Sequence, residues 1–201
     1  MPHCALYAVA RAAAERCARW RRARRPSGAG PSLLLRLLAG LDRPAAGSVV
    51  LDGRTPAELG GLPAWRARVA YVTQTPARLP GAPADTFAEA RGYSSQRERP
   101  HGDLGAAASA LLLEPSTLAQ PWATLSGGQA LRALLAVALA LRPDVLLVDE
   151  PTAACDTTSA AAVEAALKAS GAALVWVSHD PEQPARVGGR ILRIGDHHGE
   201  Q

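Results

Sequence analysis

Leu125-Ser126-Gly127-Gly128-Gln129 places a serine and two glycines directly before a long apolar segment. A serine with glycines at this position predicts that a helix begins at Ser126. The first turn of a helix has free backbone N–H groups and the positive end of the helix dipole, which together can bind a phosphate. This stretch therefore predicts a phosphate-binding helix start.

Two apolar runs downstream predict buried strands that end in polar residues. Val145–Val148 leads into Asp149-Glu150-Pro151-Thr152, and Ala173–Ser178 leads into His179. Predicted helices and strands alternate from Ser126 onward, which indicates a parallel sheet. Such sheets bind ligands at the carboxyl ends of their strands. We therefore expect Asp149, Glu150 and His179 to meet at one ligand-binding edge.

A glycine-rich segment near the amino terminus, Arg25-Pro26-Ser27-Gly28-Ala29-Gly30-Pro31-Ser32, aligns with the phosphate-loop pattern G-x-x-x-x-G-K-[ST]. Arg25 stands at the first glycine position and Pro31 at the lysine position. Proline lacks both the ammonium and the backbone N–H with which lysine holds phosphates, although it suits the first turn of a helix. The pattern thus predicts an intact fold with damaged nucleotide chemistry. The candidates to replace the missing lysine are Arg24, Arg25 and Arg36, although each is more simply interpreted as a solvated surface charge.

These motifs, in this order, resemble those of the ATP-binding subunit of ABC transporters, over roughly residues 26–194. The resemblance implies an α/β fold of the P-loop NTPase type, with a mostly parallel sheet flanked by helices. It further implies an ABC ATPase domain over residues 26–201, with a small helical subdomain inserted at about 77–142. A weaker similarity is to small bacterial ATPases of metal export.

The resemblance also implies roles for individual residues toward ATP and Mg²⁺. Glu150 would act as the general base and His179 would contact the γ-phosphate, so these two are the candidate catalytic residues. The candidate Mg²⁺ ligands are Ser32, Gln74 and Asp149. The candidate ATP-binding residues are Ser27, Gly28, Ala29, Gly30, Ser32, Leu33, Gln74, Ser126, Gly127, Gly128, Gln129 and Asp156.

The same resemblance implies partners. In this family the phosphate loop of one subunit and the signature loop of another enclose each ATP, so we expect a homo- or heterodimer of ATPase subunits. The sequence has no apolar run of the roughly 18 residues that span a bilayer. Transport would therefore need a separate transmembrane permease, with this chain cytoplasmic and peripheral on the inner face of the cell membrane.

The net charge of +4 is concentrated in one segment. Of 22 basic and 18 acidic side chains, seven arginines and one glutamate lie within residues 1–25. The remainder is slightly acidic, which argues against a nucleic-acid-binding domain. Residues 4–25 are predicted to form an Ala/Arg helix. This atypical basic segment is interpreted either as a transit peptide or as a divergent or wrongly assigned gene start.

Other elements follow from local patterns. We expect a short helix over 32–39 ended by Gly40, strands at Ser48–Leu51 and Val69–Val72, and a tight turn at Asp52-Gly53. Helices are predicted near 85–91, 105–113 and 133–141.

Three alternatives remain for function. The first is a nucleotide-binding but catalytically impaired module with a regulatory or structural role. The second, a DNA-repair or chromosome-organising ATPase, needs a long coiled coil, and no sustained heptads are present. The third is an adaptor whose basic tail binds membrane or nucleic acid.

Overall fold

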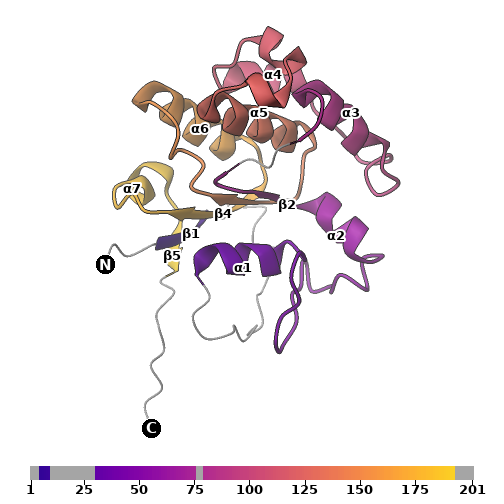
Figure 1. Ribbon diagram of the computed structural model, residues 1–201. Helices are drawn as coiled ribbons and strands as arrows, with labels where there is room; N and C mark the ends of the chain where they lie inside the picture. The colour runs from indigo at the N-terminus through magenta and orange to yellow at the C-terminus, as the bar shows by residue number, and fades with distance from the viewer. Residues whose placement is uncertain (1–4, 10–29, 76–78, 193–201) are drawn as a thin grey trace.

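A five-stranded sheet forms the centre of the molecule, in the order β2-β3-β4-β1-β5 (Figure 1). The computed structural model describes residues 5–9, 30–75 and 79–192. The strands are β1 (Ala5–Val9), β2 (Val69–Val72), β3 (Val145–Asp149), β4 (Ala173–Ser178) and β5 (Arg190–Leu192). The sequence-based predictions of Val69–Val72, Val145–Val148 and Ala173–Ser178 as strands are confirmed.

Helices cover both faces of this sheet. They are α1 (Pro31–Leu38), α2 (Leu62–Arg68), α3 (Pro83–Gly92), α4 (Leu104–Ala110), α5 (Gly127–Ala140), α6 (Thr157–Ala169) and α7 (Gln183–Val187), with short 3-10 turns at Pro115–Ala119 and Trp122–Thr124. The helices predicted over 32–39 and near 85–91, 105–113 and 133–141 all form. The second stretch of the insert ends three residues early, because Leu112 adopts a left-handed φ of 54°.

Parallel pairing of β2, β3 and β4 forms the part of the sheet that matters for the site. Val69 pairs with Val145 and Val145 pairs with Ala173, so the three strands start at the same edge and end at the opposite one. All five residues of β3 are buried, as expected for a strand covered on both faces. The carboxyl ends of β3 and β4 therefore lie side by side.

The amino-terminal segment corrects one prediction. Residues 5–9 form a strand rather than the start of the expected helix over 4–25, and β1 runs antiparallel to both β4 and β5. Ala5–Val9 has five uncharged residues, and pairing with β4 satisfies backbone groups that an open sheet edge would leave free. Val9 pairs with Leu174, so β1 ends at the edge away from Glu150 and His179. Residues 10–29 lie outside the described part of the chain.

The predicted strand at Ser48–Leu51 is wrong. Leu51 makes a single antiparallel bridge to Arg54, and residues 48–50 join no strand. A strand needs a neighbour for its backbone groups, and local β propensity does not supply one. The tight turn itself is confirmed, since Asp52 and Gly53 both have positive φ, of 52° and 78°.

Two apolar clusters lie on opposite faces of the sheet. One is formed by α1, α2 and the residues of β2, β3 and β4 that face them, among which Leu35, Trp65 and Leu147 are fully buried. The other joins the opposite face to α4, α5 and α6, which lie above the sheet in Figure 1. The helices within the expected insert at 77–142 thus pack over one face, and its status as a separate subdomain stays a prediction. Within the described part of the chain, every helix is too short or too polar to span a bilayer.

A buried hydrogen bond fixes the direction of α1. The indole N–H of Trp65, in α2, donates to the carbonyl of Leu38 at the end of α1, with 2.9 Å between Nε1 and O. Because α2 leads directly into β2, the carboxyl end of α1 lies at the amino edge of the sheet. The helix α1 therefore begins at the carboxyl edge of the sheet and ends at the amino edge.

We expect Trp65→Phe to lower the free energy of unfolding by about 1–3 kcal/mol more than Trp176→Phe does. Both tryptophans are fully buried and both changes remove the same ring volume. Only the substitution of Trp65 leaves a buried carbonyl, that of Leu38, without its donor. The Nε1 atom of Trp176 has no hydrogen-bond partner among the described residues, so its loss breaks no such bond. Urea denaturation of the two variants gives the difference, and equal losses would contradict the role assigned to this bond.

Candidate active site

The carboxyl edge of the sheet brings together the residues that end β3 and β4. Asp149 is the last residue of β3 and pairs with Val177, so Glu150 and His179 follow their strands at the same edge. The backbone N–H of Glu150 donates to the carbonyl of Val177 at 3.0 Å, which extends the pairing one residue beyond β3. Two acidic residues and a histidine therefore converge here, as the sequence predicts.

Glu150 is a buried carboxyl group that lies beside His179. Its residue is 7% exposed and its backbone has a left-handed φ of 49°. Oε1 lies 3.8 Å from Nε2 of His179 and accepts no hydrogen bond from a described residue. Burial raises the pKa of Glu150 above its ordinary value, and the nearby His179 partly opposes this rise. An unpaired buried carboxylate oxygen of this kind fits a ligand that donates a hydrogen bond, such as a water molecule, at the edge of the sheet.

Asp149 is held by a residue that the sequence interpretation did not include. The hydroxyl of Tyr71, in β2, donates to Oδ2 of Asp149 at 3.2 Å. Burial and the neighbouring Asp149 raise the pKa of Tyr71 to about 12, so this hydroxyl keeps its proton. The signal that could have identified Tyr71 is its position near the end of β2, beside the strand that delivers Asp149. One oxygen of Asp149 is thus oriented by this hydrogen bond.

The predicted Mg²⁺ ligands come from three separate elements. Asp149 ends β3, whereas Ser32 lies exposed in the first turn of α1 and Gln74 lies exposed two residues after β2. No cluster of three or more His, Cys, Asp or Glu side chains suited to a metal occurs in the described residues. One carboxylate with neutral oxygen ligands and phosphates is nevertheless a set that Mg²⁺ accepts. These residues fit the ion only together with a bound nucleotide.

The amino end of α1 departs from a normal phosphate site. Gly30 is the N-cap and Leu33, also predicted to bind ATP, donates its N–H to the Gly30 carbonyl at 3.1 Å. Pro31 is the first residue of α1 and offers no N–H. Ser27, Gly28 and Ala29, together with Arg24 and Arg25, lie outside the described residues.

Arg36, a candidate to replace the missing lysine, forms an exposed ion pair. Its Nε and Nη2 donate to the two carboxylate oxygens of Asp42 at 2.7 and 2.9 Å. A bidentate pair of this kind holds the guanidinium in one orientation. The exposed ion pair fits a surface charge, and a role of Arg36 at the phosphate loop stays a prediction.

The signature segment begins α5 as predicted. Ser126 is the N-cap: its Oγ accepts the N–H of Gln129 at 3.3 Å, and its own N–H donates to Oε1 of Gln129 at 3.0 Å. Ser126 and Gly127 are exposed, so the start of this helix faces solvent. A phosphate brought by another molecule could approach it there.

Gly128 joins the signature segment to the turn that follows Glu150. A Cβ atom built at Gly128 would lie 2.6 Å from the carbonyl oxygen of Ala154, closer than side chains allow. Arg132, one turn further along α5, donates to the carbonyls of Leu111 and Leu112 at 3.0 and 2.9 Å. The glycine thus permits close backbone contact, and the arginine ties α5 to the end of α4.

Asp156 has a structural role that the resemblance did not predict. It is the N-cap of α6, where its carboxylate accepts the N–H and the hydroxyl of Ser159 at 2.9 and 2.8 Å. These hydrogen bonds lower the pKa of Asp156. Its predicted contact with ATP stays a prediction.

With this geometry in place, comparison with known proteins identifies the family. Residues 26–153 match the sequence family described as "ABC transporter". The chain belongs to the ABC transporter family. The matched range of this ABC chain includes the signature segment, Asp149 and Glu150. His179 lies beyond it, and the fold brings His179 back against Glu150.

Relatives at 34–38% identity span most of this ABC chain. The Fe(3+) ions import ATP-binding protein FbpC 3 of Rhodococcus jostii (strain RHA1) is 36% identical over 83% of the chain and 49% of that protein. The aliphatic sulfonates import ATP-binding protein SsuB 2 of Burkholderia cenocepacia (strain HI2424) is 37% identical over 87% of the chain and 63% of that protein. The chain spans about half the length of the FbpC relatives that it matches. Since these relatives are import proteins, the similarity to metal-export ATPases stays a prediction.

Solved structures agree with the fold. An ATP-binding subunit of an ABC transporter superposes with a TM-score of 0.66 at 23% identity, over 81% of this chain and 68% of that one. The dimeric ATP-binding cassette MJ0796, bound to ADP and Pi in a post-hydrolysis state, gives 0.63 at 28% identity, over 77% and 72% of the two chains. The predicted α/β P-loop NTPase fold is confirmed.

We expect Gly128→Ala to lower the free energy of unfolding and to shift the amide resonances of residues 150–156. The added methyl group must displace the backbone at Ala154, because the two cannot occupy the same space. Gly127→Ala is the matched control in this ABC chain: its Cβ meets nothing within 4 Å, so stability should change by less than about 1 kcal/mol. Urea denaturation and amide spectra give the comparison, and equal behaviour of the two variants would contradict the close contact.

Proposed function

We propose that this chain is the ATP-binding subunit of an ABC transporter, which couples ATP binding and hydrolysis to solute movement through a partner permease. One observation carries the proposal: a buried, unpaired carboxylate oxygen of Glu150 lies 3.8 Å from the imidazole of His179. The two groups end adjacent parallel strands, where α/β proteins bind ligands. Family membership supports the nucleotide as that ligand.

The proposed chemistry divides among few residues. Glu150 is placed to accept a proton from an attacking water, and its raised pKa brings it nearer to the pH at which a base works best. His179, with a side chain 55% exposed, is placed to donate to a phosphate oxygen. Asp149, Ser32 and Gln74 would hold Mg²⁺, which supplies positive charge against the phosphates. Tyr71 keeps Asp149 in one orientation.

Two kinds of partner fit this proposal. The exposed start of α5, at Ser126 and Gly127, supports binding of a nucleotide held by a second ATPase subunit, and MJ0796 is a dimeric relative in fold. The names of the relatives, which are import ATP-binding proteins, support a separate permease as the second partner. The proposed location is the cytoplasmic face of the cell membrane. Whether the solute is a metal, a sulfonate or another small molecule depends on that permease.

We expect Glu150→Gln to reduce ATP turnover by about 100-fold or more while Mg-ATP still binds, because the amide cannot accept the proton. Phosphate release measures turnover, and calorimetric titration measures binding. Burial raises the pKa of Glu150, so its ionisation at neutral pH opposes folding, and the uncharged amide should not destabilise the protein. Glu182→Gln, at an exposed glutamate nearby, is the control for charge removal. Unchanged turnover in Glu150→Gln would reject Glu150 as the base.

A second candidate function has an observation in its favour. Pro31 begins α1 and brings neither an N–H nor an ammonium to the phosphate side of the sheet. Arg36, in the same helix, forms an ion pair with Asp42. These facts support a nucleotide-binding ABC module with weakened hydrolysis and a regulatory or structural role.

Restoring the lysine separates the two candidates. We expect Pro31→Lys to raise the affinity for Mg-ATP by roughly 10-fold or more, the effect of one charge-assisted hydrogen bond. Pro31→Ala is the matched control, since it restores the backbone N–H without the ammonium and should give a smaller gain. Binding titration and phosphate release are measured for all three proteins. Equal affinity of the lysine and alanine variants would show that no ammonium is missing from the site.

A further inference from the structure

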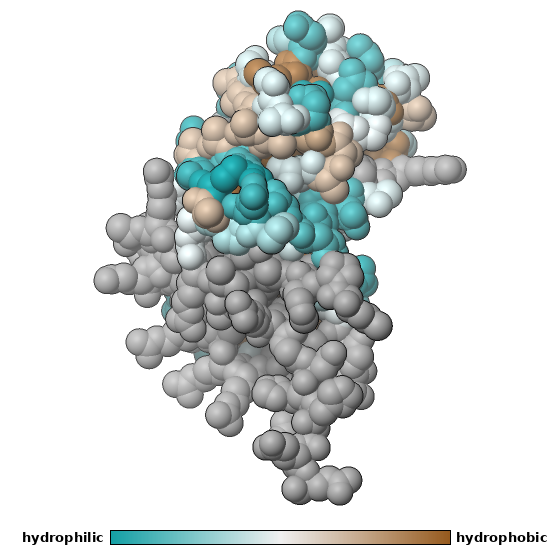
Figure 2. All heavy atoms as spheres, turned by 90° about the vertical axis from the view of Figure 1, so that its left-hand side faces the viewer, coloured by the Kyte–Doolittle hydropathy of each residue, from teal (hydrophilic) through white to brown (hydrophobic). Residues whose placement is uncertain are grey.

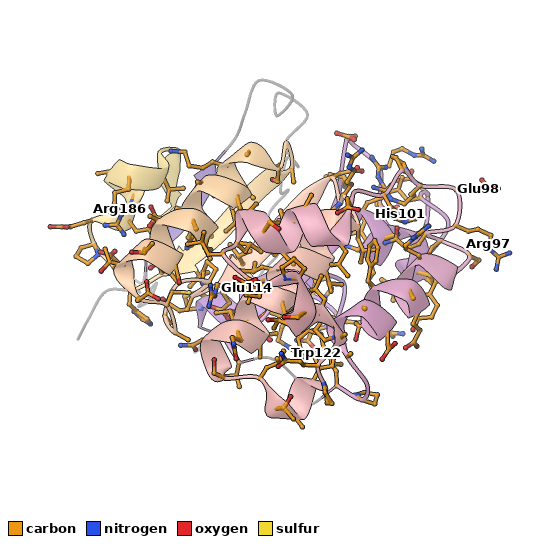
Figure 3. All side chains as sticks on the ribbon, turned by 90° about the horizontal axis from the view of Figure 1, so that it is seen from above. Arg97, Glu98, His101, Glu114, Trp122 and Arg186 are labelled. Atoms are coloured by element: carbon orange, nitrogen blue, oxygen red, sulfur yellow. The ribbon has the colours of Figure 1, made fainter. Side chains whose placement is uncertain are left out.

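We propose that Arg186 is a positioning residue that fixes His179 relative to Glu150, through a polar network anchored on α6. This inference rests on the proposed function, because it concerns the same catalytic edge. The network consists of Thr152, Glu164, Asp180, Gln183 and Arg186. In Figure 3, Arg186 lies on α7, at the side of the molecule away from His101 and Arg97.

The first branch of the network holds the residue next to His179. Nη2 of Arg186 donates to Oδ2 of Asp180 at 2.5 Å. Oδ1 of Asp180 accepts the N–H of Glu182 at 2.9 Å, and the Asp180 N–H donates to Oγ of Ser178 at 3.1 Å. The residues on both sides of His179 are thus fixed by hydrogen bonds.

The second branch connects Arg186 to a buried carboxylate on α6. The side chain of Glu164 is 11% exposed, and its carboxylate accepts from Nε and Nη2 of Arg186 at 3.2 and 3.0 Å. A buried carboxylate is costly without a partner, and the planar guanidinium can serve two carboxylates at once. Both acids raise the pKa of Arg186, which therefore stays charged. The loop after β4 is in this way attached to α6.

The third branch reaches the loop that carries Glu150. Gln183 is 1% exposed, and its Nε2 donates to Oε1 of Glu164 at 3.0 Å and to Oγ1 of Thr152 at 3.1 Å. Thr152 lies two residues after Glu150. Glu164 is therefore the common anchor for the loop after β3 and the loop after β4.

His179 needs such support because its imidazole ring makes few contacts of its own. The side chain is 55% exposed, and beyond its approach to Glu150 it makes no hydrogen bond to another described residue. Its orientation is therefore set by the backbone of residues 178–180.

The alternative is that Arg186 only holds α7 against α6 and has no effect on His179. The side of the molecule that carries α7 is rich in hydrophilic side chains (Figure 2), and Glu182 and Lys168 are exposed.

A double-mutant cycle separates positioning from clamping. Arg186→Met should lower kcat about tenfold with KM for Mg-ATP unchanged within about twofold, and should cause no further loss in a His179→Ala background. Lys168→Met is the matched control, because Lys168 of α6 also bonds α7, at the Arg186 carbonyl (3.0 Å), without touching Asp180. It should leave both constants within about twofold. Equal losses from Arg186→Met in the two backgrounds would overturn the proposal.

A second measurement needs no turnover. The imidazole resonances of His179, assigned by their loss in His179→Ala, should shift in Arg186→Met and in Asp180→Asn but not in Lys168→Met. Asp180→Asn leaves the bond between Glu164 and Arg186 in place, so it keeps the buried acid paired. Resonances that stay unmoved in both network variants would overturn the proposal. If the protein binds but does not hydrolyse ATP, the proposed function fails, and the resonances still decide whether Arg186 positions His179.

Discussion

The parallel pairing of β3 with β4 is the constraint on which the rest of the site depends. It continues past the strand, because the Glu150 N–H donates to the Val177 carbonyl before the chain turns away with a left-handed φ. That geometry leaves Glu150 buried at the edge while the next strand delivers His179 beside it. A shift of one residue in register would reverse every side chain of β3 between the two faces and remove Asp149 from Tyr71.

Asp156 and Glu150, six positions apart, differ in burial and in the hydrogen bonds that their carboxyl groups accept. Asp156 accepts two hydrogen bonds at the exposed start of α6, and they lower its pKa. Glu150 is buried with one oxygen unpaired, and burial raises its pKa. A capping carboxylate is satisfied by its neighbours, whereas an unsatisfied buried group is expected where a ligand completes its hydrogen bonds. This contrast favours Glu150 over Asp156 as the chemical group.

The sequence pattern predicted the elements that depend on residues close together in the chain. The apolar strands, the helix start at Ser126 and the turn at Asp52-Gly53 all depend on nearby residues, and they form as expected. The strand at Ala5–Val9 and the missing strand at Ser48–Leu51 depend on whether a distant chain segment offers a partner. Tyr71 and Arg186 were overlooked for the same reason, since each acts on a residue that long-range folding brings to it. Family resemblance supplied the roles of Glu150 and His179, which periodicity alone could not assign.

The proposed defect at Pro31 and the proposed catalytic edge at Glu150 lie on different elements, and this separates their consequences. The edge is built by β3, β4 and α6, none of which needs a donor from the first turn of α1. A missing charge-assisted hydrogen bond is worth about 1.5–3 kcal/mol, which corresponds to roughly 10- to 150-fold in affinity. The substitution should therefore appear mainly as weak nucleotide binding, with the base and the imidazole still in place. In the proposed dimer, a partner subunit with an intact phosphate loop would then receive from this chain a signature helix that Pro31 does not affect.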